Sequence, residues 1–267
     1  MQLATAQLAA QSGDDRIAAT DNSVVVLDGA SCFTPQGTAA GTFVDALSNE
    51  LVHHLHSGHK DLRNALSSAI ATTKDQLSLE PGSSPSSTVA IVRFNRHTIE
   101  TLVLGDSMIV IGENDDSYDV VVDERLAELD LPEARLYQRR LEAGAGYDDK
   151  HRAILAQLQR SERAHRNRQG GYWIAEADPA AANHALVAQY PRQDTEWVIL
   201  ATDGAAEPLT TLGISWPQVA RMNEVELSAL LSLCHQWEST EDPDGQQQPR
   251  AKRHDDKTLA VIRLVAD

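Results

Sequence analysis

Aspartates that stand where short apolar segments end constrain this chain more than any other feature of its sequence. Asp28 and Asp203 follow the apolar segments SVVVL and WVILA, and each precedes a glycine. Asp106 lies in a Gly-Asp-Ser turn between two further apolar segments. β-Branched and aromatic residues favour strands, whereas Asp and Gly together favour turns. The pattern therefore predicts strands whose ends carry carboxylates.

The two ends of the chain add acidic pairs of the same kind. Asp14 and Asp15 follow an N-terminal strand-like segment, and Asp255 and Asp256 precede the last one. A carboxylate in a turn can reach a shared point without being buried inside a sheet, but several like charges repel one another unless a cation holds them. Mg²⁺ and Mn²⁺ bind through a few carboxylates plus water, and a glycine such as Gly29 lets its carbonyl approach closely. Taken one at a time, each Asp-Gly pair remains ordinary turn chemistry.

Composition excludes several classes of protein. The chain carries 23 Lys+Arg against 39 Asp+Glu, and a net charge of −16 opposes nucleic-acid binding, which usually requires a basic stripe. A hydrophobic content of 42% argues against a disordered chain. No apolar run is long enough to span a membrane and the N-terminus has no basic signal region, so a cytoplasmic location is expected. Two cysteines, Cys32 and Cys234, are too few for a disulfide framework or a CxxC zinc site.

The periodicity of apolar residues predicts an α+β fold in one domain of residues 1–267. Helices are predicted over 38–56, over 62–77 with Asp61 as N-cap, and over 216–237. Strands are predicted over 23–27, 88–94, 99–104, 108–111, 172–175, 196–201 and 258–265, the second and third as a hairpin. Residues 115–168 are charged and predicted to form an exposed, mostly helical excursion, and 240–253 a mobile loop. Strands gathered at both ends of the chain favour α+β over a βαβ repeat.

Five segments that carry the aspartates resemble, in order, the PP2C (PPM) family of metal-dependent Ser/Thr protein phosphatases, in its bacterial form. They are GDDRIAATDNSVVVLDGAS, PSSTVAIVRF, LGDSMIVI, WVILATDGAAE and HDDKTLAVIRL, and they span residues 13–264. The resemblance implies a four-layer α-β-β-α sandwich with two central antiparallel sheets. It also implies two Mg²⁺ or Mn²⁺ ions, with a third in some family members, and a phosphorylated protein as substrate. Neither nucleic acid nor membrane is an expected partner, and the oligomeric state is left open.

The resemblance also implies the residues of the site. The implied metal ligands are Asp14, Asp15, Asp28, Gly29, Asp106, Asp203 and Asp255. Asp28 would bridge the two ions and Gly29 would offer its carbonyl oxygen, while Asp106 would serve the third ion. Catalysis would depend above all on Asp28, Asp203 and Asp15. No substrate-binding residue is assigned.

Two of these assignments concern acidic pairs in which the sequence departs from the family pattern. Asp203 and Asp255 would complete the shell of the first ion, and Asp255 is preferred to Asp256 because it matches the first position of the family's Asp-Asn pair. Asp14 stands where the family usually has glutamate. Together with Asp15 it would serve the second ion, directly or through water.

Two departures from the family pattern leave an alternative open. Ala10 occupies the place of the phosphate-binding arginine, and Arg16, six positions away, is a poor substitute. Ala30 stands where a histidine or a glycine often follows Asp-Gly. The chain is therefore either an enzyme or a pseudophosphatase, a regulatory binding module on the same fold. In the family, the region that corresponds to residues 135–168 carries a flap that influences substrate choice.

Two other hydrolase classes fit poorly. Ser107 in Gly-Asp-Ser could be the nucleophile of a GDSL hydrolase, but that class needs an N-terminal serine and a late Asp-x-x-His, which the sequence lacks. Asp28 after a strand is similar to the haloacid-dehalogenase nucleophile, but Ala30 occupies the position of that motif's second aspartate.

Overall fold

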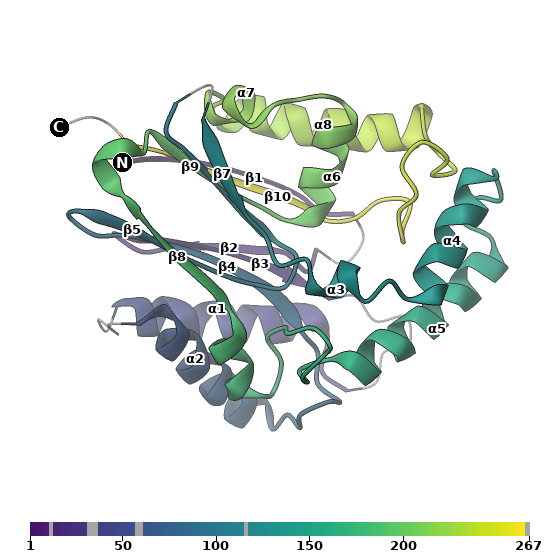
Figure 1. Cartoon of the computed structure of the whole chain (residues 1–267), viewed down its shortest axis with the longest axis horizontal. Helices are drawn as coiled ribbons and strands as arrows, with labels where there is room; N and C mark the ends of the chain where they lie inside the picture. The colour runs from purple at the N-terminus through teal and green to yellow at the C-terminus, as the bar shows by residue number, and fades with distance from the viewer. Residues whose placement is uncertain (11–12, 31–36, 57–60, 115–116, 265–267) are drawn as a thin grey trace.

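Two five-stranded antiparallel sheets form the centre of the computed structural model, which describes residues 1–10, 13–30, 37–56, 61–114 and 117–264 (Figure 1). Cys32 lies outside these residues. In spatial order, the first sheet consists of β1 (Gln2–Leu8), β10 (Lys257–Arg263), β9 (Trp197–Ala201), β6 (Met108–Gly112) and β7 (Tyr118–Val121). The second consists of β2 (Arg16–Ala19), β3 (Ser23–Gly29), β4 (Ser87–Phe94), β5 (Thr98–Leu104) and β8 (Leu186–Pro191). The predicted α+β sandwich is confirmed.

Helices cover the outer faces of both sheets (Figure 1). The second sheet is covered by α1 (Ala40–His56) and α2 (Leu62–Leu77), and the first by α6 (Asp203–Thr211), α7 (Trp216–Ala220) and α8 (Glu224–Thr240). In β3, Val24 and Val26 enter the core between the sheets, whereas Val25 and Leu27 pack under α1 and α2. A strand buried on both faces needs apolar residues at every position, which explains the unbroken VVVL segment.

The charged excursion lies at one end of the sandwich. Its first part forms β7 at the edge of the first sheet, a largely exposed strand in a segment predicted to be mostly helical. The remainder forms α3 (Arg125–Glu128), α4 (Pro132–Glu142) and α5 (Asp149–His165). Helices α4 and α5 lie beside the segment, yellow in Figure 1, that leads into β10. Two short 3₁₀ helices, η1 (Pro179–His184) and η2 (Arg192–Asp194), flank β8.

Several sequence predictions are confirmed in detail. The helix predicted over 62–77 has its N-cap at Asp61, whose carboxylate accepts a hydrogen bond of 2.8 Å from the backbone N–H of Arg63. The hairpin of β4 and β5 is present and antiparallel. Among the described residues, no helix combines the length and the apolar character that crossing a membrane would require.

Other predictions are wrong. Residues 172–175 form no strand and contribute only isolated bridges, and the edge position next to β5 belongs to β8. The helix predicted over 216–237 is two helices, because the side chain of Asn223 caps α8 by accepting from the N–H groups of Val225 and Glu226. The predicted mobile loop at 240–253 is held by a buried ion pair of 2.6 Å between Arg250 and Asp242.

Candidate functional site

Strand register brings the acidic turns to one end of the sandwich. In the first sheet, Met108 and Leu259 both pair with Ala201, so that β6, β9 and β10 are aligned where Asp106, Asp203 and Asp255 flank them. In the second sheet, Asp28 pairs with Thr88 near the end of β3. The turn that contains Asp106 joins β5 of the second sheet to β6 of the first. Carboxylates from both sheets therefore meet at a common edge.

Four of the predicted ligands lie close enough to a fifth, Asp28, for their charges to act on its carboxylate. We refer to Asp15, Asp28, Asp106, Asp203 and Asp255 as the aspartate cluster. Burial, followed by repulsion from the other four carboxylates, raises the pKa of Asp28 well above its ordinary value. Burial and the charge of Asp203 raise the pKa of Asp106 to about 7. Such mutual repulsion is expected where acidic groups share a site that a cation would complete.

Asp15 offers the clearest sign that a cation fits. Its Oδ2 accepts hydrogen bonds from Thr258 Oγ1 at 2.7 Å and Thr202 Oγ1 at 3.1 Å. Its Oδ1 is buried and has no hydrogen-bond partner among the described residues. Burial raises the pKa of Asp15 to about 7, against the hydrogen bond from Thr258 that lowers it. A buried carboxylate oxygen without a donor is costly, and a hard dication would satisfy it.

The glycines that follow Asp28 and Asp203 are required by close contacts. A Cβ atom at Gly29 would lie 2.8 Å from the Cβ of Asp14, and one at Gly204 would lie 2.1 Å from the carbonyl oxygen of Asp256. No side chain fits at either position. The absence of a side chain at Gly29 thus lets Asp14 lie directly beside this residue.

The two aspartates before β10 have different surroundings. The carboxylate of Asp256 accepts from the backbone N–H groups of Ala10 at 2.7 Å and Asp14 at 2.6 Å, and so fastens the N-terminal acidic loop to β10. Asp255 instead accepts from Lys252 Nζ at 2.7 Å. Its pKa is raised by burial and by Asp203, against the lowering effect of Lys252. These contacts favour Asp255 over Asp256 as a residue that faces the cluster.

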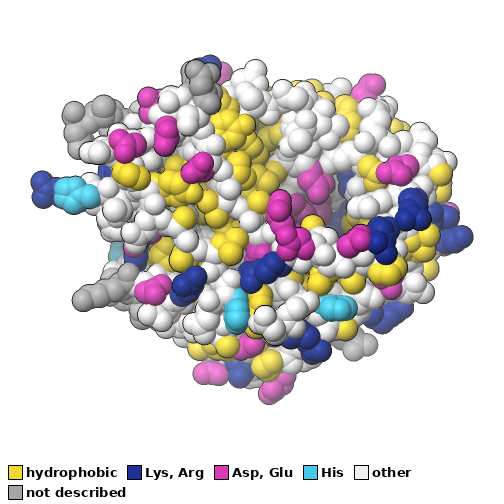
Figure 2. All heavy atoms as spheres, viewed as in Figure 1, with side chains coloured by type: hydrophobic (Ala, Val, Ile, Leu, Met, Phe, Trp, Pro, Cys, Tyr) yellow, Lys and Arg dark blue, Asp and Glu magenta, His cyan; other side chains and the backbone are white. Residues whose placement is uncertain are grey.

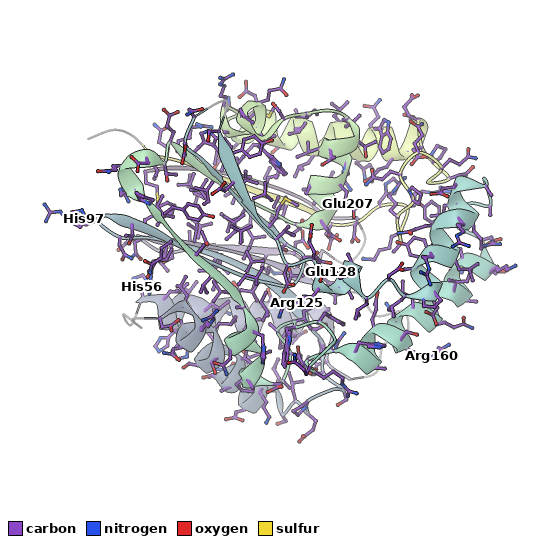
Figure 3. The ribbon with its side chains drawn as sticks, in the orientation of Figure 1. His56, His97, Arg125, Glu128, Arg160 and Glu207 are labelled. Atoms are coloured by element: carbon purple, nitrogen blue, oxygen red, sulfur yellow. The ribbon has the colours of Figure 1, made fainter. Side chains whose placement is uncertain are left out.

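Three residues near the cluster were missed by sequence reasoning. Burial, then the charge of Asp203, raises the pKa of Glu207 to about 7, and burial raises the pKa of Glu162 to about 7. Burial raises the pKa of Tyr137 on α4 to about 12, and the charges of Glu207, Glu162 and Asp203 add to the shift. Glu207 projects from α6 toward α3 in Figure 3, and acidic side chains gather beside a hollow on this face in Figure 2. Only Glu207, one helical turn after Asp203, had a sequence signal.

The departures from the family pattern have structural consequences. Arg16 Nε donates to Asp45 Oδ1 at 2.5 Å, and its Nη1 donates to the carbonyl oxygens of Gly13 at 2.6 Å and Asp15 at 2.7 Å. Arg16 is thus engaged in holding the acidic loop. Ser107 is fully buried with its Oγ 2.5 Å from Thr88 Oγ1, which gives a nucleophile no access to substrate and argues against a GDSL-type site.

A second group of potential metal donors lies on α8 and in the segment between α8 and β10. In the part of the chain that the structure describes, His235, Glu238 and His254 are the only three such side chains with donor atoms all within 4.8 Å of one another. Glu238 is already paired, because its Oε1 lies 2.7 Å from Nζ of the buried Lys257 and its Oε2 lies 2.8 Å from His254 Nδ1. Both carboxylate oxygens of Glu238 are therefore already engaged, and this group is built as a network of opposite charges.

Comparison with known proteins gives one consistent result. The family model described as protein phosphatase 2C matches residues 9–232, and no curated protein sequence matches the chain. The serine/threonine phosphatase PstP/Ppp of Mycobacterium tuberculosis is 14% identical over 98% of each chain, with a TM-score of 0.56. Stp1 of Staphylococcus aureus is 11% identical over 99% of this chain and 95% of its own, with a TM-score of 0.58. The catalytic domain of PstP in complex with two manganese ions is 15% identical over 97% and 96%, with a TM-score of 0.55.

Proposed function

Because the chain belongs to the protein phosphatase 2C family, we propose that it is a metal-dependent phosphatase acting on phosphoserine and phosphothreonine in other proteins. The observation that carries the proposal is the convergence of carboxylates from five separate turns at one edge of the two sheets. The pKa values of Asp15, Asp28, Asp106 and Asp255 are raised by burial and by neighbouring carboxylates, as at a site that awaits cations. One similar structure holds two manganese ions, which supports Mn²⁺ or Mg²⁺ as the cofactor.

We assign the metal-holding residues to the turns described above. Asp28 would serve both ions, the carbonyl oxygen of Gly29 would serve one of them, and Asp203 and Asp255 would complete the shell of the first. The second ion would be served by Asp14 and Asp15, and a third by Asp106. When bound, the ions supply positive charge for the phosphate oxygens and lower the pKa of a water molecule, so that it can attack phosphorus.

Neighbouring residues hold the proposed metal ligands in position. Thr202 and Thr258 hold Oδ2 of Asp15, and its buried Oδ1, which has no hydrogen-bond partner among the described residues, stays available to a cation. The carboxylate of Asp256 accepts a hydrogen bond from the backbone N–H of Asp14. The position of Asp14 therefore does not depend on a bound cation. Such a fixed arrangement matters because phosphoryl transfer depends on positioning and electrostatics more than on a side-chain nucleophile.

The test is hydrolysis of p-nitrophenyl phosphate and of a phosphoserine peptide with Mn²⁺, with and without a chelator. We expect turnover that is lost with the chelator and falls at least about a hundred-fold in Asp203→Asn, since that change removes a charged oxygen ligand. Asp75→Asn, on the exposed side of α2, is the matched control and should retain wild-type activity. Turnover that ignores both the chelator and Asp203→Asn contradicts the proposal.

A binding module without turnover is the second candidate, and Ala10 favours it. The N–H of Ala10 donates to Asp256, so this position lies beside the site although it lacks the arginine that other family members carry. Introducing that arginine as Ala10→Arg separates the candidates. A gain in turnover of about ten-fold or more indicates an intact site without its phosphate contact, whereas binding of metal with no turnover in either protein supports the binding module.

A further inference from the structure

Strands β7 and β8 are the edges of the two sheets on one side of the sandwich. Among the described strands, β7 pairs with β6 alone and β8 with β5 alone. Both strands cross the front of the molecule in Figure 1. Because the backbone groups of alternate residues in a strand point to opposite sides, each edge presents N–H and C=O groups that pair with no described strand. Each edge can therefore accept a further strand.

The side chains of these two edges are apolar and exposed. Of the large hydrophobic side chains that are exposed among the described residues, half belong to β7 and β8, namely Tyr118, Val120, Leu186 and Val187. Figure 2 shows hydrophobic side chains gathered on this face, with acidic side chains beside them. Proteins normally protect a sheet edge with charged residues such as lysine, or with a bulge or proline, yet neither strand contains Lys or Arg, and Pro191 is only the last residue of β8. Such an edge is suited to pairing with another segment.

A small hollow lies between the two edges, where β7 begins and β8 ends. Its lining combines aromatic rings with carboxylates, which come from Glu113, Tyr118, Asp119, Tyr190 and Asp194. Two of these residues belong to β7 and one to β8, so the hollow joins the two edges into one surface. We refer to β7, β8 and this hollow as the edge surface.

The carboxylates of the hollow are not neutralised by neighbouring cations. No salt bridge among the described residues includes Glu113, Asp119 or Asp194. Arg192 stands two residues before Asp194, but its Nη1 is directed to the β4–β5 hairpin, where it donates to the carbonyl oxygen of Asn95 at 3.5 Å. The hollow therefore attracts an ammonium or guanidinium group, which its tyrosine rings can also bind through their faces.

We propose that the edge surface binds an extended basic segment of a partner protein, which adds to β8 as a further strand and places a lysine or arginine side chain in the hollow. The strand edge supplies main-chain hydrogen bonds, and the carboxylates and tyrosine rings select the cation. We choose β8 over β7 because it has 6 residues instead of 4. A second copy of this chain, with a net charge of −16, would bring the same carboxylates to the contact and be repelled.

The experiment measures the fluorescence anisotropy of a short labelled peptide in which lysine and valine alternate. An ionic strength of about 0.15 M screens charges more than about 8 Å apart, so attraction by the overall charge of the chain is small. Asp119→Asn/Asp194→Asn removes two carboxylates of the hollow, and Val187→Lys places a positive charge on the edge of β8. We expect saturable binding to wild type and a dissociation constant at least about ten-fold higher in each variant, the loss of one charged hydrogen bond.

Two control proteins carry the same kinds of change elsewhere. Asp75→Asn/Glu80→Gln removes two exposed carboxylates from α2 and from the turn that follows it, and Val225→Lys adds a lysine on the exposed side of α8. Each control has the same net charge as the variant that it matches, so that only the position differs. We expect both controls to bind the peptide as wild type does.

Hydrogen exchange locates the bound segment. We expect the lysine peptide to slow the exchange of backbone amides in β8, since a new strand would accept hydrogen bonds from those that point away from β5. Exchange in β2, the opposite edge of the same sheet, should not change.

Each other result overturns the inference. A peptide that does not bind, or that binds the variants and controls equally well, would show that the edge surface has no part in recognition. Equal binding of a peptide in which glutamate and valine alternate would exclude selection by the carboxylates, and unchanged exchange in β8 would exclude strand addition. A wild-type dimer in sedimentation that is lost in Val187→Lys would assign the surface to a second copy. None of these readouts depends on metal or turnover, so the proposed function is tested separately.

Discussion

Two groups of buried charges lie next to each other in this fold and are built in opposite ways. In the paired network, which consists of Glu238, Asp242, Arg250, His254 and Lys257, acids and bases alternate. The ion pair between Arg250 and Asp242 is 2.6 Å long, and that between Lys257 and Glu238 is 2.7 Å. In the aspartate cluster, by contrast, four carboxylates act on that of Asp28 by repulsion, and an ion pair of 2.7 Å joins one of them, Asp255, to Lys252.

The comparison distinguishes charges that stabilise the fold from charges that repel one another and are held together by the fold. The paired network joins α8 to the loop before β10 and satisfies its own charges, so it needs nothing further. At neutral pH the aspartate cluster opposes folding, because the neighbouring carboxylates raise the pKa values of Asp28 and Asp106. Groups whose pKa values are raised in this way gather at functional sites. Lys257 of the paired network donates to the carbonyl oxygen of Asp255 at 3.1 Å, so the network can hold this member of the cluster in position.

Breaking the paired network should give the largest effect on stability. Arg250→Met leaves Asp242 buried without its partner, and removing one member of a buried pair costs about 3–5 kcal/mol. We expect that loss in the free energy of unfolding measured by urea denaturation. Arg96→Met, at the exposed turn between β4 and β5, is the control and should change stability by less than about 0.5 kcal/mol. An Arg250→Met protein as stable as wild type would show that the network is not structural.

Removing one charge from the aspartate cluster should raise the free energy of unfolding, the opposite of the effect expected for Arg250→Met. Asp106→Asn takes away a repelling carboxylate whose pKa is raised to about 7, so the metal-free protein should become more stable by about 1–2 kcal/mol. Mn²⁺ should then stabilise the variant less than it stabilises wild type. Urea denaturation with and without Mn²⁺ measures both effects, and Asp75→Asn should show neither. A metal-free Asp106→Asn protein that is less stable than wild type would contradict the comparison.

The pH dependence of stability should reflect the raised pKa values in the aspartate cluster. Burial raises the pKa values of Asp15 and Asp106 to about 7, above their ordinary value of 3.8, so the folded metal-free protein holds more protons than the unfolded chain between these limits. The stability from this source is complete below about pH 4 and is lost as pH rises through about 7. Mn²⁺ must displace those protons, so its effect on Tm should be larger at pH 8 than at pH 5.5. Equal Tm shifts at both pH values would be inconsistent with metal binding by these carboxylates.

The smallest expected effect concerns the support of Asp15. Thr258→Val removes the hydrogen bond of 2.7 Å to Asp15 Oδ2, which should destabilise the protein by about 1 kcal/mol and weaken Mn²⁺ binding by about ten-fold. Thr101→Val, in β5, loses only a long contact of 3.4 Å to the carbonyl oxygen of Ala188 and serves as the matched control. Calorimetric titration with Mn²⁺ measures the difference, and equal affinities in the two variants would argue against a role for Thr258.

The sequence predicted those parts of the molecule that depend on local patterns. The apolar run before Asp28 and the N-cap at Asp61 are local signals, and both are confirmed. The edge strand β8 was missed because an exposed edge needs no apolar run, and Leu186–Pro191 alternates weakly. The break at Asn223 was missed because apolar residues continue on both sides of it.

The sequence indicates those site residues that share one local pattern, an aspartate in a turn at the end of a strand. The convergence of Asp28 and Asp106 follows from strand register, which apolar patterns specify. Glu162 and Lys252 reach the cluster from segments whose paths depend on tertiary contacts alone, such as that between His151 and Ala251. Such contacts join segments that are distant in the sequence and leave no local pattern, so these residues could be found only in the structure.

The central claim is that the aspartate cluster is a site for divalent cations, and diffraction from crystals soaked in Mn²⁺ tests it most directly. We predict two anomalous peaks among the carboxylates of Asp15, Asp28, Asp203 and Asp255, and none at these places in Asp28→Asn. Anomalous peaks confined to other surfaces, or unchanged by Asp28→Asn, would contradict the account.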